Sequence, residues 1–320
     1  TLTLRTLGLV IVVLFLLILL GLAGWFFAFM YEAEAPSAGL QPLPEYLSKA
    51  QKLTVTAEDK KRGLKAVKLS IAQGGKETVL LDEKLSYEGL LNRDGTHQYR
   101  KEISIDPSAL KLAQGEFTIL LNVWDHSRRG EGNHAGFQHK SIVDTVPPSL
   151  RAISRMHNVN AGGVGFAVYQ TSADTASSGI FVDDLFFPGY PDQGQTEKGI
   201  HHCFFAVAYD KTSGPKISLW AKDKAGNEAT TSFYYRVIRK KFREDKIELT
   251  DQLIEKLLSY FSFYSLEAEE SDLKKFLKIN NELRRENHET LYRLKDQTSP
   301  EKLWDGVWLS LPNGQTMARF

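Results

Sequence analysis

The longest apolar run lies near the amino terminus, where residues 6–31 (TLGLVIVVLFLLILLGLAGWFFAFMY) carry no charged side chain. A helix of about 20 apolar residues is long enough to cross a bilayer. Arg5 precedes the run, Glu32 and Glu34 follow it, and aromatic residues gather at its far end as in an interfacial belt. The pattern predicts a transmembrane anchor over residues 1–31, with most of the chain facing away from the cytoplasm.

A cleaved signal peptide is the alternative, because Ala33, Glu34 and Ala35 have the small-x-small form of a cleavage site. The apolar core of a signal peptide spans about 7–15 residues, which is shorter than this run. We therefore expect a retained anchor. Cleavage would leave the orientation of the chain unchanged.

Beyond the anchor, residues 32–49 are rich in Ala, Pro, Ser and Gly, and predict a juxtamembrane spacer that is extended around Pro42 and Pro44. Short segments of alternating polarity follow, separated by turn signals such as Gly74-Gly75 and Asp106-Pro107. Repeated short strands without intervening helices predict a β-sandwich over residues 50–146. Its strand candidates are KLTVTAED, LKAVKLSIAQ, KETVLLDEKL, KEISIDPSAL and GEFTILLNVWDHS.

The same texture returns over residues 147–238, and both blocks close on a shared phrase: an apolar strand with Trp, then Asp, then a Gly-Asn turn. The phrase comprises Trp124, Asp125 and Gly132-Asn133 in the first block, and Trp220, Asp223 and Gly226-Asn227 in the second. It resembles the last hairpin of bacterial immunoglobulin-like modules. The separator DTVPPS (residues 144–149) suits a joint between modules, since Pro147-Pro148 cannot continue a central strand. Two tandem immunoglobulin-like sandwiches are therefore predicted.

The periodicity changes after Arg239. Apolar residues at spacings of three and four predict a helix capped by Thr250, and a second, longer helix closed by Pro300. We expect a helical hairpin over residues 239–299. Its apolar stripe, Leu273, Phe276, Leu277 and Leu283, packs either on the first helix through Leu253, Leu257 and Phe261 or on another domain.

Charge and cysteine content narrow the function classes. The 320 residues include 40 Lys and Arg against 39 Asp and Glu, a net charge of +1, so nothing predicts nucleic-acid binding. Cys203 is the single cysteine, which excludes an internal disulfide framework and a multi-thiolate zinc cluster. The fold class is mainly β with some α structure. Without disulfides or a thiolate zinc cluster, we expect apolar cores to stabilise it.

Motifs for catalysis do not converge. None of the eight histidines lies in a His-x-His, His-x-x-x-Asp or His-Glu-x-x-His spacing. His201, His202 and Cys203 are the best metal candidates, but side chains that alternate along a strand point apart. The glycines of residues 162–165 precede a strand and lack the Lys-Ser/Thr of a phosphate loop. No catalytic, cofactor-binding or metal-ligating residue is assigned.

Several segments resemble the upstream part of bacterial membrane-anchored lysostaphin-like (LytM-type) zinc metallopeptidases. They are GGVGFAVYQTSADTASSGIFVDDLFFPGYP, WAKDKAGNEATTSFYYRV, INNELRRENHETL and the closing LPNGQTMARF. The resemblance implies that residues 300–320 begin a β-rich domain whose zinc ligands lie beyond Phe320, so none is carried over. It also implies a bacterial inner-membrane protein with a periplasmic bulk, and peptidoglycan or a division regulator as partner.

Three function classes follow. The chain is expected to position or restrain a downstream peptidoglycan endopeptidase, with the hairpin as a lid or as a spacer. A membrane-anchored adhesion or scaffold protein is the alternative, because the same sandwiches host many functions. A self-contained enzyme has the least support. A downstream reading frame with His-x-x-x-Asp and His-x-His would favour the peptidase, and a stop codon would favour the scaffold.

Overall fold

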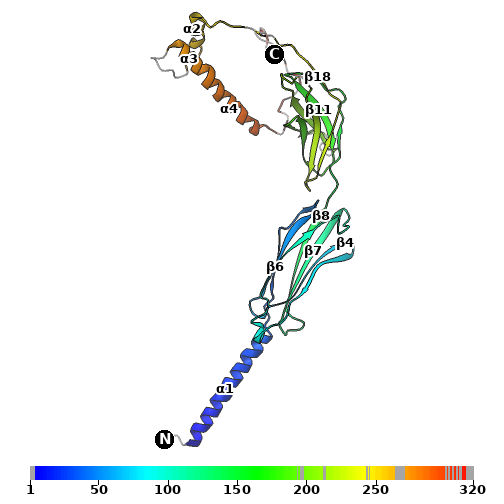
Figure 1. Cartoon of the computed structure of the whole chain (residues 1–320), viewed down its shortest axis with the longest axis vertical. Coiled ribbons are helices and arrows are strands. Elements are labelled where there is room, and N and C mark those ends of the chain that lie inside the picture. Colours follow the sequence, from blue (N-terminus) through cyan, green and yellow to red (C-terminus); the bar gives the residue numbers. More distant parts are fainter. Residues whose placement is uncertain are drawn as a thin grey trace. The chain divides into compact units, whose positions relative to one another are not determined.

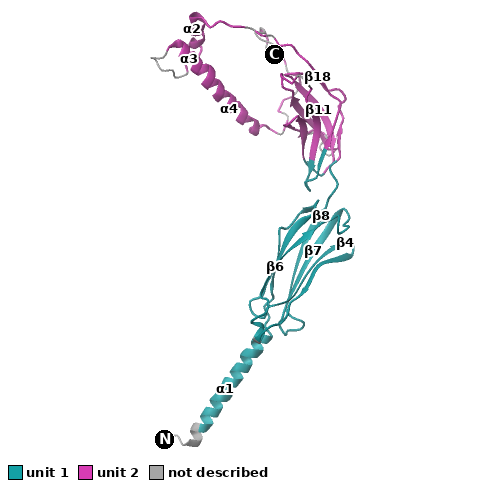
Figure 2. Ribbon diagram, in the orientation of Figure 1, with its two compact units in different colours: residues 1–148, 174–176, 222–229 teal, residues 149–173, 177–221, 230–320 magenta. Residues whose placement is uncertain are grey.

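The protein is described here from a computed structural model. The described residues are 4–192, 194, 198–211, 214–242, 244, 246–263, 271–299, 301, 303–304, 306–307, 309 and 312–314. The chain separates into two compact units, the first built mainly from residues 1–148 and the second mainly from the rest (Figure 2). The loops Asp174–Ala176 and Lys222–Ala229 belong to the first unit. The expected domain start at residues 300–320 lies largely outside the described residues.

Helix α1 (Leu4–Met30) begins the first unit (Figure 1). Residues Gly8–Met30 are apolar and long enough to cross a membrane. Most of their side chains are exposed to the surroundings of the helix, as they are in a span that lipid would cover. The chain thus has one amino-terminal apolar helix suited to a single span or a signal sequence.

The first sandwich has an immunoglobulin-like topology. One sheet has the order β1-β3-β6 and the other the order β2-β8-β7-β4-β5, with β2 parallel to β8. These sheets correspond to strands A, B and E, and to A′, G, F, C and C′, of such a domain. The strands are β1 (Ser37–Gln41), β2 (Tyr46–Leu47), β3 (Gln51–Glu58), β4 (Leu64–Gln73), β5 (Lys76–Lys84), β6 (Gln98–Ile105), β7 (Gly115–Asp125) and β8 (His134–Val143).

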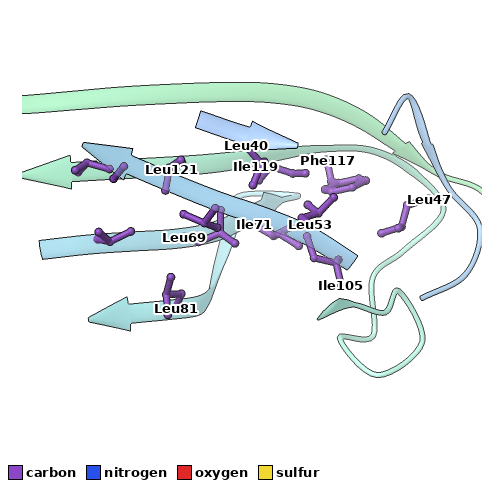
Figure 3. Close-up of a cluster of buried hydrophobic side chains, with 14 of the residues drawn as sticks. Leu40, Leu47, Leu53, Leu69, Ile71, Leu81, Ile105, Phe117, Ile119 and Leu121 are labelled. Atoms are coloured by element: carbon purple, nitrogen blue, oxygen red, sulfur yellow. The ribbon is translucent and has the colours of Figure 1, made fainter. Parts of the chain in front are cut away.

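The core between these sheets follows the alternation read from the sequence. Along β7, Phe117, Ile119 and Leu121 are buried while the residues between them are only partly covered. They share one core with Leu69 of the neighbouring strand β4 and with Leu53 of β3 in the opposite sheet (Figure 3). The period of two therefore predicts both the strands and the face that each one buries.

The segment 32–49 differs from the prediction of a spacer. Leu40 of β1 pairs with Val55 of β3 and is buried in the core, and Leu47 of β2 pairs with Val143 of β8. The sequence does not reveal these two short strands, because a strand of two to five residues carries little periodic signal. Each strand holds one buried core residue. The sandwich therefore begins directly after α1.

The second sandwich repeats the arrangement. One sheet has the order β14-β15-β11-β9, the other the order β13-β12-β16-β17, and β10 runs parallel to β18. Its core includes the buried Tyr169, Phe205 and Leu219. The strands are β9 (Leu150–Ala152), β10 (Asn158–Asn160), β11 (Val164–Thr171), β12 (Thr175–Val182), β13 (Leu185–Pro188), β14 (Tyr190–Pro191), β15 (Ile200–Ala206), β16 (Ile217–Asp223), β17 (Glu228–Thr231) and β18 (Arg236–Ile238).

The carboxyl-terminal helices form the expected pair. Helix α2 (Asp251–Ser259) starts at Thr250, whose hydroxyl accepts from the Leu253 amide at 3.3 Å. The longer helix comprises α3 (Asp272–Lys278), a π-helical turn η3 (Ile279–Leu283) and α4 (Arg284–Leu294), followed by the short 3₁₀ turn η4 (Lys295–Gln297). Part of the stripe packs between the helices: Leu257 and Phe261 line one apolar cavity of about 430 Å³ with Phe276 and Leu283. Leu273 and Leu277 stay exposed.

The β7–β8 turn yields a matched pair of glycine variants. Gly132 has a φ of 111°, and a Cβ there would collide with the main-chain oxygen of Asp125. Gly130 has a φ of 62° with nothing within 4 Å of an added Cβ. We expect Gly132→Ala to lower the free energy of unfolding by about 2–4 kcal/mol, and Gly130→Ala by about 1 kcal/mol. Denaturant unfolding of the full chain in detergent micelles measures both, and equal losses would contradict this prediction.

Candidate functional site

The shared Asp…Gly-Asn phrase forms a buried polar clamp in the first sandwich. Asp125 ends β7 and is fully buried. Its Oδ1 accepts from the Asn133 amide at 2.6 Å and from the Ser127 amide at 3.0 Å, and its Oδ2 accepts from Asn133 Nδ2 at 2.8 Å. A buried carboxylate is tolerated only where such donors replace water. The turn residues Ser127 and Asn133 therefore supply the hydrogen-bond donors that the buried carboxylate of Asp125 needs.

The clamp also holds the chain where it leaves α1. Asn133 Nδ2 donates to the main-chain oxygens of Glu32 and Glu34, both at 3.1 Å. The Ser127 hydroxyl donates to the same Glu32 oxygen at 2.9 Å, and the Arg128 amide donates to Met30 at 2.9 Å. The end of the apolar helix is thus fastened to the last hairpin of the sandwich.

A buried arginine adds a second attachment. The guanidinium of Arg62, a residue only 1% exposed, lies 5.2 Å from the ring centre of Phe29 and 5.4 Å from that of Tyr87. Its Nη1 donates to the Leu91 oxygen at 3.3 Å and its Nη2 to the Tyr87 hydroxyl at 3.2 Å. Desolvated cation–π contacts of this kind stabilise by about 2 kcal/mol. Phe29 of α1 is thereby tied to the β3–β4 loop.

Three carboxylates converge at this joint. Oxygen atoms of Glu32, Asp59 and Asp125 all lie within 4.8 Å of one another, and the residues are 7%, 4% and 0% exposed. Burial, and then the charge of Asp59, raise the pKa of Glu32 above its usual value. Lys61 Nζ lies 3.4 Å from Glu32 but 2.8 Å from Glu34. The joint is a site of buried, incompletely compensated negative charge.

The same construction occurs where the chain enters the second sandwich. Asn227 Nδ2 donates to Asp223 Oδ2 and to the main-chain oxygen of Asp144, both at 2.9 Å. Oxygens of Asp144, Asp174 and Asp223 lie within 4.8 Å of one another. Burial is the first cause of the raised pKa of Asp144, and the neighbouring Asp223 and Asp174 add to it. All three residues belong to the first compact unit.

The residues weighed as a metal site are placed apart. Cys203 on β15 is buried, and its thiol donates to the Phe187 oxygen at 3.3 Å. Burial raises the pKa of this thiol to about 12, so it stays protonated. The ring of His201 stacks on Tyr169, whereas His202 lies beside Phe166 and Tyr190. Among the described residues, these three do not form a ligand cluster.

The sequence predicts the Asp…Gly-Asn turns, but neither their hydrogen bonds to the entering segments nor the carboxylate clusters. Asp125, Asp223 and their asparagines were read from the repeated phrase as turn residues. The partners Asp59 and Asp174 lie in β3–β4 and β11–β12 loops, and Glu32 and Asp144 in the entering segments. An acidic residue before each block and another after its first long strand are the available signal. The glycines at residues 162–163 form the predicted turn before β11.

The second sandwich also presents an exposed aromatic face. Phe166 of β11 and Phe204 of β15 pair across the sheet, with ring centres 4.8 Å apart, and are 46% and 48% exposed. His202 and Tyr190 lie on the same sheet, with ring centres 6.4 Å apart. Adjacent half-exposed rings are typical of surfaces that bind partners.

No family model matches the chain, and no curated protein matches it. Solved structures of tandem immunoglobulin domains are similar to it. Sidekick-1 immunoglobulin domains 1–5 share 13% identity over 65% of this chain and 40% of that one, with a TM-score of 0.30. Murine CEACAM1b shares 10% identity over 63% and 100% (TM-score 0.29), and the I9–I11 tandem of titin 12% over 65% and 67% (TM-score 0.25). This chain therefore spans less than half of the Sidekick-1 fragment, and likeness at these scores carries no functional argument.

The raised pKa of Glu32 predicts a pH dependence in metal-free buffer. A raised pKa in the folded state contributes stability that is present below the ordinary value of 4.5 and is lost as the pH rises through the folded value. We expect Glu32→Gln, which stays neutral, to become more stable relative to wild type as the pH rises from 4.5 toward neutrality. Thermal unfolding of the full chain in micelles with EDTA measures this difference.

Glu34 supplies a control of opposite sign. Its hydrogen bond to Lys61 lowers its pKa below 4.5, so its contribution is present above that pH and is lost on acidification. Glu34→Gln should therefore fall behind wild type above pH 4.5. The same pH trend for both variants would contradict the assignment.

Proposed function

We propose that this chain is a membrane-anchored immunoglobulin-like spacer that presents a module beyond the bilayer. The observation that carries the proposal is the attachment of residues 30–34 to the first sandwich by the Asn133 amide, the Ser127 hydroxyl and the Arg128 amide. A flexible tether would need none of these hydrogen bonds. A helix end that is hydrogen-bonded to the sandwich instead fixes the position of the sandwich relative to the membrane.

The same contacts support retention of the anchor. Cleavage after Ala35 would remove Glu32 and Glu34, whose main-chain oxygens satisfy the clamp, and Phe29, which covers Arg62. Buried donors that lose their acceptors cost about 1–3 kcal/mol each. A signal peptide is removed without such a penalty when it does not belong to the folded domain. The resemblance to LytM-type peptidases, with Arg5 before the apolar run and Glu32 and Glu34 after it, supports a bacterial inner membrane with the sandwiches in the periplasm.

Tagged protein tests this placement. One epitope precedes Leu4 and another is inserted between Gly74 and Gly75, a turn where an added Cβ meets nothing within 4 Å. Both tags are expected on one polypeptide in the membrane fraction, and protease added to spheroplasts should digest the sandwiches. A membrane-free polypeptide that carries only the internal tag would reject the anchor, and protected sandwiches would reverse the orientation.

The finer form of the proposal names the presented module. The resemblance of FFPGYP and NNELRRENHETL to membrane-anchored LytM-type peptidases supports a downstream zinc endopeptidase that acts on peptidoglycan. The anchored sandwiches would set its distance from the bilayer, since each domain of about 100 residues adds tens of ångströms. The helical hairpin would restrain it only if the exposed Leu273 and Leu277 contact that module.

Two deletions in the full-length protein separate spacing from restraint. Removal of residues 147–238 should lower wall hydrolysis in cells by about tenfold or more while leaving the purified protein active on isolated sacculi, because only reach is lost. Removal of residues 250–295 should raise hydrolysis in both assays if the hairpin is a lid. Unchanged activity of a folded 250–295 deletion would leave the hairpin a spacer, and full cellular activity without residues 147–238 would reject the spacing role.

An adhesion or scaffold role is the second candidate. The exposed Phe166 and Phe204, with His202 and Tyr190 beside them, favour it because they offer a partner an aromatic face. A peptidase spacer has no need of that face. The reading frame that follows Phe320 separates the candidates, as a stop codon favours adhesion and a continuation with His-x-x-x-Asp and His-x-His favours the peptidase.

A further inference from the structure

The carboxylates at the joint of α1 and the first sandwich have the arrangement of a cation site. We propose that Glu32, Asp59 and Asp125 bind a hard divalent cation of the calcium class. Calcium takes oxygen ligands at about 2.3–2.6 Å, so two ligands of one ion lie at most about 5 Å apart. The oxygens of this cluster lie within 4.8 Å of one another, so they fit a single coordination sphere.

The second observation is the unpartnered carboxylate of Glu32. The residue is 93% buried, and neither of its carboxylate oxygens has a hydrogen-bond partner. Lys61 Nζ approaches only Oε2, at 3.4 Å, and stands closer to Glu34 at 2.8 Å. A buried carboxylate oxygen without a donor destabilises the fold, the more so when it is charged. Among the residues that the structure describes, Lys61 is the ion-pair partner of Glu32, and it leaves Glu32 Oε1 without a partner.

Nearby cations are directed elsewhere. The guanidinium of Arg62 lies over the rings of Phe29 and Tyr87 and donates to the Leu91 oxygen. Lys61 is half-exposed and is shared between Glu32 and Glu34. Asp59 and Asp125 use Oδ1 to accept main-chain amides, which orients both carboxylates without neutralising them. A bound divalent cation would supply the missing charge.

A cluster of three carboxylates occurs at the same place in both sandwiches, and this recurrence supports a ligand-binding role. Each sandwich draws one acid from its entering segment, one from the loop after β3 or β11, and one from the end of β7 or β16. The second cluster also has a buried oxygen without a partner, Asp174 Oδ1. The first cluster is the more buried of the two and carries the proposal.

A cation at this position would join three separate segments. It would link the residue after the apolar helix to the β3–β4 loop and to the last hairpin, which already meet through Asn133 and Arg62. Binding to the folded state alone raises stability with cation concentration. The anchor joint would then stiffen when the cation is present.

Calorimetric titration of the full chain tests the proposal. The protein, in detergent micelles, is stripped with EDTA, dialysed into potassium chloride, and titrated separately with calcium chloride and magnesium chloride. We expect binding of at least one of the two ions by wild type, and Glu32→Gln to weaken it by about tenfold or more. Glu102→Gln is the matched control, because Glu102 is an exposed carboxylate of the same sandwich that faces Lys52 at 3.8 Å. It should bind as wild type does.

Either of two titration results would overturn the proposal. One is the absence of binding of either ion by wild type at millimolar concentration, and the other is equal affinity in Glu32→Gln and wild type. Thermal unfolding of wild type is a readout that depends on no variant: the transition of the first sandwich should rise with the ion that binds. An unchanged midpoint, together with a Glu32→Gln variant that is more stable than wild type, would assign Glu32 as a protonated buried acid without a ligand.

Discussion

The hydrogen bonds of one asparagine side chain, Asn133, determine how the chain enters its first sandwich. A buried carboxylate at the end of β7 requires donors, and the Asn133 main chain and side chain provide two of them. The second proton of the same side-chain amide is shared between the oxygens of Glu32 and Glu34. One amide group therefore closes the hairpin and fixes the helix end together. Removing the amide would weaken both, and would leave the helix end held by Ser127, Arg128 and Arg62.

This attachment brings a cost with it. Fixing the Glu32 main chain places its side chain beside Asp59 and Asp125, where burial and like charge disfavour ionisation. Natural folds retain such electrostatic strain where a ligand or a proton relieves it. The opposite pKa directions of Glu32 and Glu34, which share Lys61, show how sharply burial separates two acids only two residues apart.

Sequence reasoning succeeded where a period or a cap carries the signal. The alternation in β7, the Thr250 cap and the paired Asp…Gly-Asn phrases predicted strands, a helix start and two immunoglobulin-like closing hairpins, which the structure confirms. It missed β1 and β2, whose two to five residues carry no readable period. The clusters were also missed, because Glu32, Asp59 and Asp125 meet only through the pairing of strands that are distant in sequence.

The repetition of the clamp argues that the two sandwiches share one design rather than only one topology. Topology alone requires a turn between β7 and β8 or between β16 and β17, and many residues can make a turn. It does not require an Asn that bonds both the preceding Asp and the entering main chain, yet Asn133 and Asn227 each do so. The clamp partners are eight positions apart in the β7–β8 turn and four apart in the β16–β17 turn, so the hydrogen bonds are kept while the loop length changes. What recurs is the connection between each sandwich and the segment before it.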